Sequence, residues 1–137
     1  MNTPGNNPQD IFEKGDPASA DYFTGTAWVK ILVPVDDTFN TSIGNVVFEP
    51  GARNNWHTHG GGQVLVVTEG VGYYQEKGQP VQVIRKGDIV KIAPSVLHWH
   101  GASHDNALTH LAINTNTQKG VVEWLDPVTD EEYNSAR

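Results

Sequence analysis

Short runs of apolar and β-branched residues recur along most of the chain. Residues 26–33, 42–49 and 63–70 are rich in Val, Ile, Leu and Phe, a composition that is typical of strands. Similar runs, bounded by Gly, Pro or Asn, lie at 56–59, 71–78, 80–87, 88–94, 98–102 and 106–115. About eight to ten strands at regular spacing predict an all-β sandwich or barrel, because βαβ units would need long helical runs between the strands.

The two ends of the chain differ from this middle part. Residues 1–20 are polar and rich in Asn, Pro and Gly, so we expect an N-terminal arm, followed by one domain over residues 21–137. Near the C-terminus, Thr129 stands three residues before Glu132. This is the spacing of a capping box, and it predicts a short C-terminal helix with Trp124 among its packing contacts.

Composition and charge narrow the classes of function. The 137-residue chain fits one domain. Its net charge of −7 argues against a nucleic-acid partner, because a phosphate backbone would be repelled. No apolar run approaches the roughly 20 residues that span a bilayer, and the N-terminus has no signal-peptide pattern. We therefore expect a cytoplasmic protein without a membrane partner. The absence of Cys excludes thiolate ligands and disulfides.

Six histidines carry the strongest chemical signal in the sequence. His57 and His59 are two positions apart, so on a strand they share a face, and the same holds for His98 and His100. Neutral imidazole binds Mn, Fe, Ni, Cu and Zn. Gln63 follows a run of three glycines, where a bend can return its side chain toward the same centre. This pattern indicates a metal site with nitrogen and oxygen ligands.

Several neighbouring residues have simpler interpretations. Trp99 alternates with its two histidine neighbours, so its side chain should point away from the metal. Arg53 and Asn54 precede the first histidine pair and could line an entrance to it, but we expect both to be exposed to solvent. We expect His104, in a Ser-His-Asp-Asn segment, to be a solvated loop residue.

Two motifs resemble those of the cupin family. The pattern that resembles the first cupin motif is Gly51-x5-His57-x-His59-x3-Gln63-x6-Gly70. The pattern that resembles the second is Gly87-x5-Ala93-Pro94-Ser95-x2-His98, in which Ala93 replaces the usual Pro and Ser95 the usual Gly. The resemblance covers residues 24–116. It implies a single-domain cupin jelly-roll β-barrel, in which three His and one carboxylate hold a metal ion.

Gln63 departs from this family pattern, because most cupins have Glu at its position. An amide oxygen is a neutral donor, so a bound ion would keep its full charge. We expect a stronger Lewis acid toward a substrate oxygen and a preference for the divalent state, which argues against redox chemistry.

The chain is also similar to a narrower group, the bacterial manganese-dependent cupin hydroxynitrile lyases of the (R)-mandelonitrile lyase type. The matching stretches are 21–26, 48–59, 62–63, 97–102 and 108–114. The resemblance implies a divalent ion, with Mn preferred over Fe, Zn or Ni. The implied ligands are His57, His59, Gln63 and His98. His110 lies where that group has its catalytic base.

The resemblance implies the cleavage or formation of cyanohydrins, with a metal-activated substrate oxygen and His110 as general base. The residues expected to contact a small-molecule substrate are Val46, Leu65, His100, Leu108, Ala112 and Asn114. Two alternatives stay open: an Fe-dependent cupin dioxygenase, and a non-enzymatic protein that binds a metal or a small ligand. Cupins of this size are often dimers or tetramers, so a homo-oligomer is expected.

Overall fold

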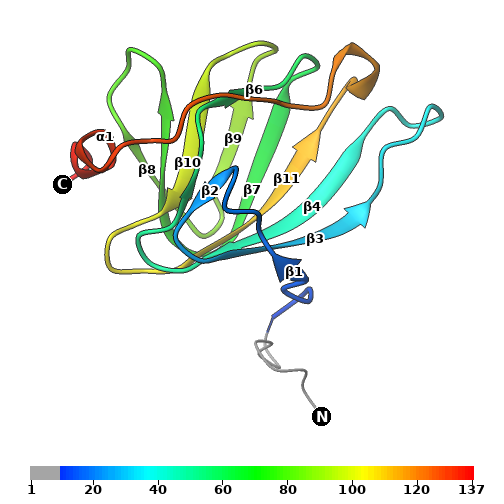
Figure 1. The fold of residues 1–137 in the computed structure, drawn as a ribbon. Helices are drawn as coiled ribbons and strands as arrows, with labels where there is room; N and C mark the ends of the chain where they lie inside the picture. The colour runs from blue at the N-terminus through cyan, green and yellow to red at the C-terminus, as the bar shows by residue number, and fades with distance from the viewer. Residues whose placement is uncertain (1–9) are drawn as a thin grey trace.

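The computed structural model describes residues 10–137, and its strands pair into one strongly curled sheet (Figure 1). The elements in chain order are β1 (Asp16–Pro17), β2 (Phe23–Thr24), β3 (Ala27–Val33), β4 (Ser42–Phe48), β5 (Arg53–Asn54), β6 (His57–Thr58), β7 (Gln63–Glu76), β8 (Gln82–Arg85), β9 (Ile89–Ile92), β10 (His98–Ala102), β11 (Leu108–Asn114), a 3-10 turn (Thr117–Lys119), β12 (Glu123–Trp124) and α1 (Asp130–Asn134). The main strand order is β1-β3-β4-β11-β7-β10-β5-β2, and neighbouring strands are antiparallel. The prediction of an all-β barrel with one short C-terminal helix is confirmed.

β7 joins the two halves of the sheet. Residues 63–70 and 71–78 were predicted as two strands, but the chain continues without a turn as one strand of 14 residues. Its first half pairs with β11 and β9, and its second half pairs with β10 and β8. The change of partners occurs at Gly70, where φ is 85° and where a Cβ atom would collide with the Ala107 carbonyl oxygen. Gly70 therefore bends the strand where the sequence pattern predicted an end.

The inner faces of β4, β11 and β7 form rows of side chains across the three strands. Starting where β7 begins, the rows are Ser42–Asn114–Gln63, Gly44–Ala112–Leu65 and Val46–His110–Val67. The first row is polar and the second contains two small residues. Beyond the third row, Phe48 and Leu108 are fully buried. The interior thus changes from polar and open at one end to apolar and filled at the other.

The outer face of β10 is covered by the C-terminal segment. After β11 the chain runs across one end of the curled sheet to α1 (Figure 1). A second apolar cluster forms beneath it from Trp56, Tyr73, Trp99, Val128 and Tyr133. Trp99 is fully buried there, so its side chain does point away from the inner face.

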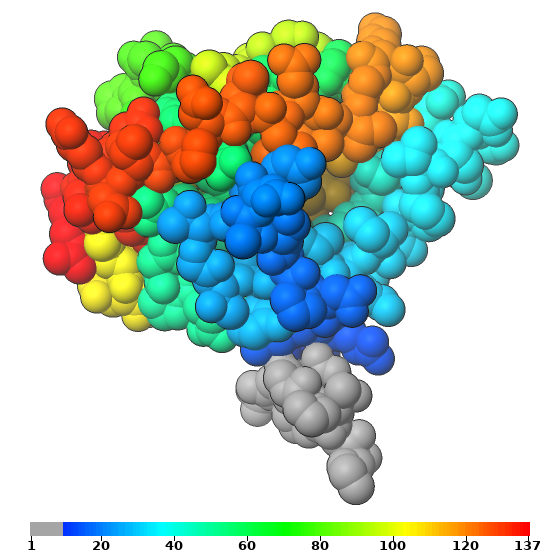
Figure 2. Space-filling model, viewed as in Figure 1, coloured from blue at the N-terminus to red at the C-terminus, as the bar shows by residue number. Residues whose placement is uncertain are grey.

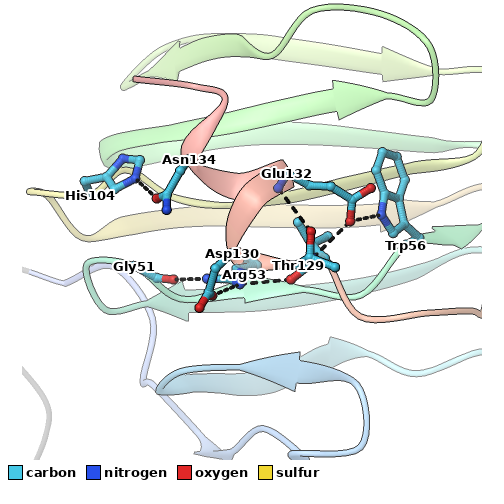
Figure 3. A network of polar contacts seen from close by, with 9 residues as sticks. Gly51, Arg53, Trp56, His104, Thr129, Asp130, Glu132 and Asn134 are labelled. Carbon is cyan, nitrogen blue, oxygen red and sulfur yellow. Dashed lines mark hydrogen bonds and ion pairs between the residues drawn. The ribbon is translucent and has the colours of Figure 1, made fainter.

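Polar contacts hold α1 against the barrel (Figure 3). The helix starts with the predicted capping box, in which Thr129 and Glu132 bond reciprocally. Arg53 Nη2 donates to the Val128 carbonyl at 2.9 Å and to Asp130 Oδ1 at 2.8 Å. Only 6% of Arg53 is exposed, so the expectation of a solvent-exposed residue was wrong. The charge-assisted bonds of its Nη2 to a backbone carbonyl and a carboxylate offset part of the cost of burying this side chain.

His104 also belongs to this attachment of α1. One ring nitrogen lies 2.8 Å from the Tyr73 hydroxyl oxygen, and the other lies 2.9 Å from Asn134 Oδ1. Its ring packs against Tyr133 at 4.5 Å between centroids. The expectation of a solvated loop residue was therefore wrong, because the helix folds back onto this loop.

The described part of the predicted arm joins the edge of the sheet. β1 pairs with β3, with Asp16 opposite Val29, while residues 1–9 lie outside the described residues. Between residues 10 and 137, no helix is long and apolar enough to cross a membrane.

Replacing Tyr133 should test how much the C-terminal attachment stabilises the barrel. The ring is 3% exposed and its hydroxyl donates to the Ala102 carbonyl at 2.6 Å. We expect Tyr133→Ala to lower the free energy of unfolding by about 3–5 kcal/mol, the usual range for deleting a buried aromatic ring. Tyr133→Phe should cost about 1 kcal/mol, because it removes only the hydrogen bond. Urea unfolding measures both, with the exposed Glu131→Gln as control; equal losses for Phe and Ala would contradict this account.

Candidate metal centre

Three buried imidazoles meet at the polar end of the barrel. His57 lies in β6 directly opposite His98 in β10, and His59 follows β6. The ring centroids of His57 and His98 are 4.2 Å apart, those of His57 and His59 are 5.0 Å apart, and those of His59 and His98 are 5.4 Å apart. None of the three residues is more than 4% exposed. The expected convergence of these histidines is therefore present in the fold.

Backbone carbonyls define the tautomer of each of these rings. The Nδ1 atoms of His57, His59 and His98 lie 2.7, 2.6 and 2.9 Å from the carbonyl oxygens of Asn55, Val121 and Val96. A carbonyl only accepts, so each Nδ1 carries the proton and donates it. Each Nε2 is then left with a lone pair. Metal-binding histidines commonly have their second nitrogen fixed in this way.

Gln63 adds an oxygen to the same space. Its Nε2 donates to Asn114 Oδ1 at 2.9 Å, while its Oε1 lies 3.4 Å from His98 Nε2. Burial lowers the pKa of His98 to about 4, so the ring is neutral near pH 7. Two lone pairs therefore face each other without a hydrogen between them, and a cation would satisfy both. His59 Nε2 is also buried without a hydrogen-bond partner. Three imidazole nitrogens and one amide oxygen fit a divalent transition-metal ion.

His100 lies next to these residues, and its ring nitrogens already have partners. The imidazole nitrogens of His57, His98 and His100 can be chosen within 4.8 Å of one another, so this triad too can hold a metal. However, His100 Nδ1 lies 2.9 Å from His110 Nε2, and Asn54 Nδ2 lies 3.2 Å from the same ring. His59, by contrast, has an unpartnered nitrogen. Hydrogen bonding thus favours His59 over His100 as the third nitrogen ligand.

His110 lies one hydrogen bond behind His100. It is fully buried between Val46 of β4 and Val67 of β7, and it does not line the cavity described below. Burial lowers the pKa of His110 to about 4, and burial with the adjacent His110 lowers the pKa of His100 well below 6.5. A proton that reaches His110 from the cavity must therefore pass through His100.

A cavity of about 210 Å³ opens beside the histidines. Figure 2 shows the surface hollowed between the blue N-terminal segment, the cyan strands and the orange late segment. The lining residues are Phe23, Val29, Ile31, Ser42, Gly44, Val46, Asn54, His57, His59, Gln63, His100, Ala112, Asn114, Val122 and Trp124. The lining thus combines apolar side chains with histidines and amides.

Four of the six residues expected to contact a substrate line this cavity, namely Val46, His100, Ala112 and Asn114. Leu65 and Leu108 do not, because both are fully buried in the apolar core. Leu65 pairs with Val90 of β9, on the side of β7 away from β11. Leu108 fills the space above Gly72, where a Cβ would lie 2.6 Å from its Cδ2 atom. Neither residue lines this cavity, because strand alternation predicts the face of a residue and not which neighbours will cover it.

Trp124 and Asn54 line the cavity, although the sequence favoured another place for each. Trp124 was expected to pack with the helix, but it lies opposite His57 in β12, with 4.8 Å between the ring centroids. Asn54 was expected to be exposed, but it is 3% exposed, and its Oδ1 accepts from the His100 backbone N–H at 2.9 Å. Neither has a local sequence signal, because each reaches the site through pairing between distant segments.

Comparison with known proteins agrees with this architecture. The model of the Cupin domain family matches residues 44–114. A protein of Granulicella tundricola named (R)-mandelonitrile lyase is 46% identical over 114 residues, which cover 83% of this chain and 87% of that protein. The crystal structure of a cupin-like protein from Thermotoga maritima superposes with a TM-score of 0.90 at 54% identity, covering 93% of this chain and 96% of the other. A cupin-2 domain protein of Rhodospirillum rubrum, at 18% identity, shares the fold with a TM-score of 0.64, covering 85% of this chain and 74% of that chain.

The fold and the site together define a class of small β-barrel proteins with a histidine triad that can hold a metal ion inside the barrel. The family match and the identity to its relatives place the chain plainly: it belongs to the cupin family.

In the metal-free protein, the free energy of unfolding should fall as the pH is lowered below 6.5. Burial lowers the pKa of His57, His59, His98, His100 and His110 below the ordinary value of 6.5. Above pH 6.5 these rings are neutral in both states, so they cost no stability. Between pH 6.5 and 4 the unfolded chain binds more protons than the folded chain, and stability is progressively lost.

Urea unfolding at a series of pH values measures this dependence. Between pH 6.5 and 4, we expect the slope of the free energy of unfolding against pH to correspond to the uptake of more than one proton on unfolding. The variant His110→Gln should reduce this uptake by about one proton. A free energy of unfolding that stays constant from pH 7 to 4 would contradict the assignment of neutral buried rings.

Proposed function

We propose that this chain is a metal-dependent lyase that cleaves cyanohydrins and, in reverse, forms them from an aldehyde and cyanide. The observation that carries the proposal is the set of inward lone pairs on His57, His59, His98 and Gln63 at the end of a cavity with an apolar wall. The 46% identical relative named (R)-mandelonitrile lyase supports the choice of reaction.

The ligands in this proposal are His57, His59, Gln63 and His98, with Mn²⁺ as the preferred ion. A divalent cation held there supplies Lewis acidity, which lowers the pKa of a substrate hydroxyl that it coordinates. The neutral Gln63 amide supports this role, because it leaves the charge of the ion uncompensated by the protein. The carbonyls that accept from each Nδ1 keep the three rings oriented before any ligand binds.

The hydrogen-bonded pair His100 and His110 acts as the base. His100 lines the cavity, so it accepts the hydroxyl proton of the cyanohydrin, while His110 stabilises the resulting imidazolium through the 2.9 Å bond to Nδ1. As the carbonyl forms, the carbon–carbon bond breaks and its electron pair leaves with cyanide. The proton held by the pair then passes to cyanide, which balances the reaction as aldehyde and hydrogen cyanide.

The apolar wall holds the organic group of the substrate. Val29, Val46 and Ala112 form one side, and Trp124 forms the other beside the ring of His57. This wall keeps water from the reacting carbon and turns the hydroxyl toward the polar end.

Cleavage of (R)-mandelonitrile by protein loaded with Mn²⁺ tests the proposal directly. Benzaldehyde release is followed by its absorbance and cyanide by a colorimetric assay, with protein stripped of metal by a chelator as control. We expect release that depends on the added ion. Oxygen uptake with a catechol or diketone, without cyanohydrin cleavage, would instead indicate a dioxygenase.

Removing His110 should separate proton transfer from metal binding. We expect His110→Ala to lower kcat by about 100-fold or more, the usual contribution of a general base, while the bound Mn²⁺ measured by elemental analysis stays unchanged. His100→Ala should have a similar effect, and the double variant should lose little more, because the pair acts as one unit. Thr109→Val, on the opposite face of β11, serves as matched control. Full activity in His110→Ala would rule out this role.

A further inference from the structure

We propose that Asn114, held by Ser42, is a positioning residue that turns the oxygen of the Gln63 amide toward the three histidines. The inference rests on the proposed metal site, since it concerns how that site obtains its oxygen ligand.

The three residues form the polar row across β4, β11 and β7. Asn114 lies opposite Ser42 on one side and opposite Gln63 on the other. Asn114 Nδ2 donates to Ser42 Oγ at 3.1 Å, and Gln63 Nε2 donates to Asn114 Oδ1 at 2.9 Å. Ser42 and Gln63 are 9% and 4% exposed, so water has little access to either end of the row.

The direction of these hydrogen bonds decides which Gln63 atom faces the histidines. In the observed direction, every donor points toward Ser42, and Gln63 Oε1 is left 3.4 Å from His98 Nε2. In the reverse direction, Ser42 donates to Asn114, Asn114 donates to Gln63, and Gln63 Nε2 donates to His98, so the two acceptors no longer face each other. The two directions have nearly the same shape, because an amide can turn over in place.

The two directions have opposite consequences for a cation. The first directs an amide oxygen at the ion, whereas the second directs an N–H group, which repels it. A Glu at position 63 would not meet this problem, because both its terminal atoms are oxygens. The neutral ligand therefore needs a neighbour that accepts from its amide nitrogen, and Asn114 Oδ1 is the acceptor that the structure supplies.

Two substitutions at position 114 separate this role from simple packing. Asn114→Asp only accepts, so it keeps Gln63 Oε1 toward the histidines, and we expect Mn²⁺ affinity equal to that of the unmodified protein or tighter. Asn114→Leu neither accepts nor donates, so we expect the dissociation constant for Mn²⁺ to rise about 10- to 100-fold, as for other residues that orient metal ligands. Affinity is measured by calorimetry, and the coordination of the ion by the electron paramagnetic resonance spectrum of bound Mn²⁺.

The same substitution in Gln63→Glu protein gives the decisive comparison. There we expect Asn114→Leu to change Mn²⁺ affinity by less than about threefold, because a carboxylate has no wrong orientation. Far-UV circular dichroism verifies folding, and Thr109→Val controls for changes to β11. Equal losses of affinity with Gln63 present and in the Gln63→Glu protein would show a merely structural role and overturn the inference. If the unmodified protein binds no Mn²⁺, the proposed function itself fails, which is a separate result.

Discussion

The site depends on several lone pairs that face one another among buried side chains. Each of three neutral imidazoles donates one proton outward to a backbone carbonyl, and each keeps an unshared pair directed inward. Gln63 adds an amide oxygen to them at 3.4 Å from His98. Buried acceptors without donors are costly, because they have lost water and gained nothing in return. A cation bound among these groups would remove this cost.

Keeping these groups in place requires parts of the chain that are far apart in sequence. The carbonyl that fixes His59 belongs to Val121, and the ring beside His57 belongs to Trp124. Both lie in the segment that crosses the end of the barrel before α1. The capping box of α1 and its contacts with Arg53 hold this segment down. Loosening the C-terminal attachment would therefore also loosen the contacts that orient His57 and His59.

The type of side chain on the inner surface of the barrel also changes from row to row. Hydrogen-bonding side chains occupy the row nearest His57, His59 and His98, the next row contains the small residues Gly44 and Ala112, and beyond it apolar side chains surround His110. The small row is what leaves room for the cavity, because Gly44 and Ala112 carry almost no side-chain volume there.

The sequence alone determined the β architecture and the capping box of the helix, because strand periodicity and cap spacing are local properties. The convergence of His57, His59 and His98 was expected from the resemblance of two motifs to those of cupins. Tertiary structure decided what no local pattern contains. It decided that 63–76 is one bent strand, that Leu65 and Leu108 are packed in the apolar core and do not line the cavity, and that Trp124 faces His57. It also decided that His110 is reached through His100 and that Asn114 bonds to Gln63. These features arise from pairing between distant segments. Strand alternation predicts on which side of the sheet a side chain lies, but it does not predict which residue of another strand will lie beside it.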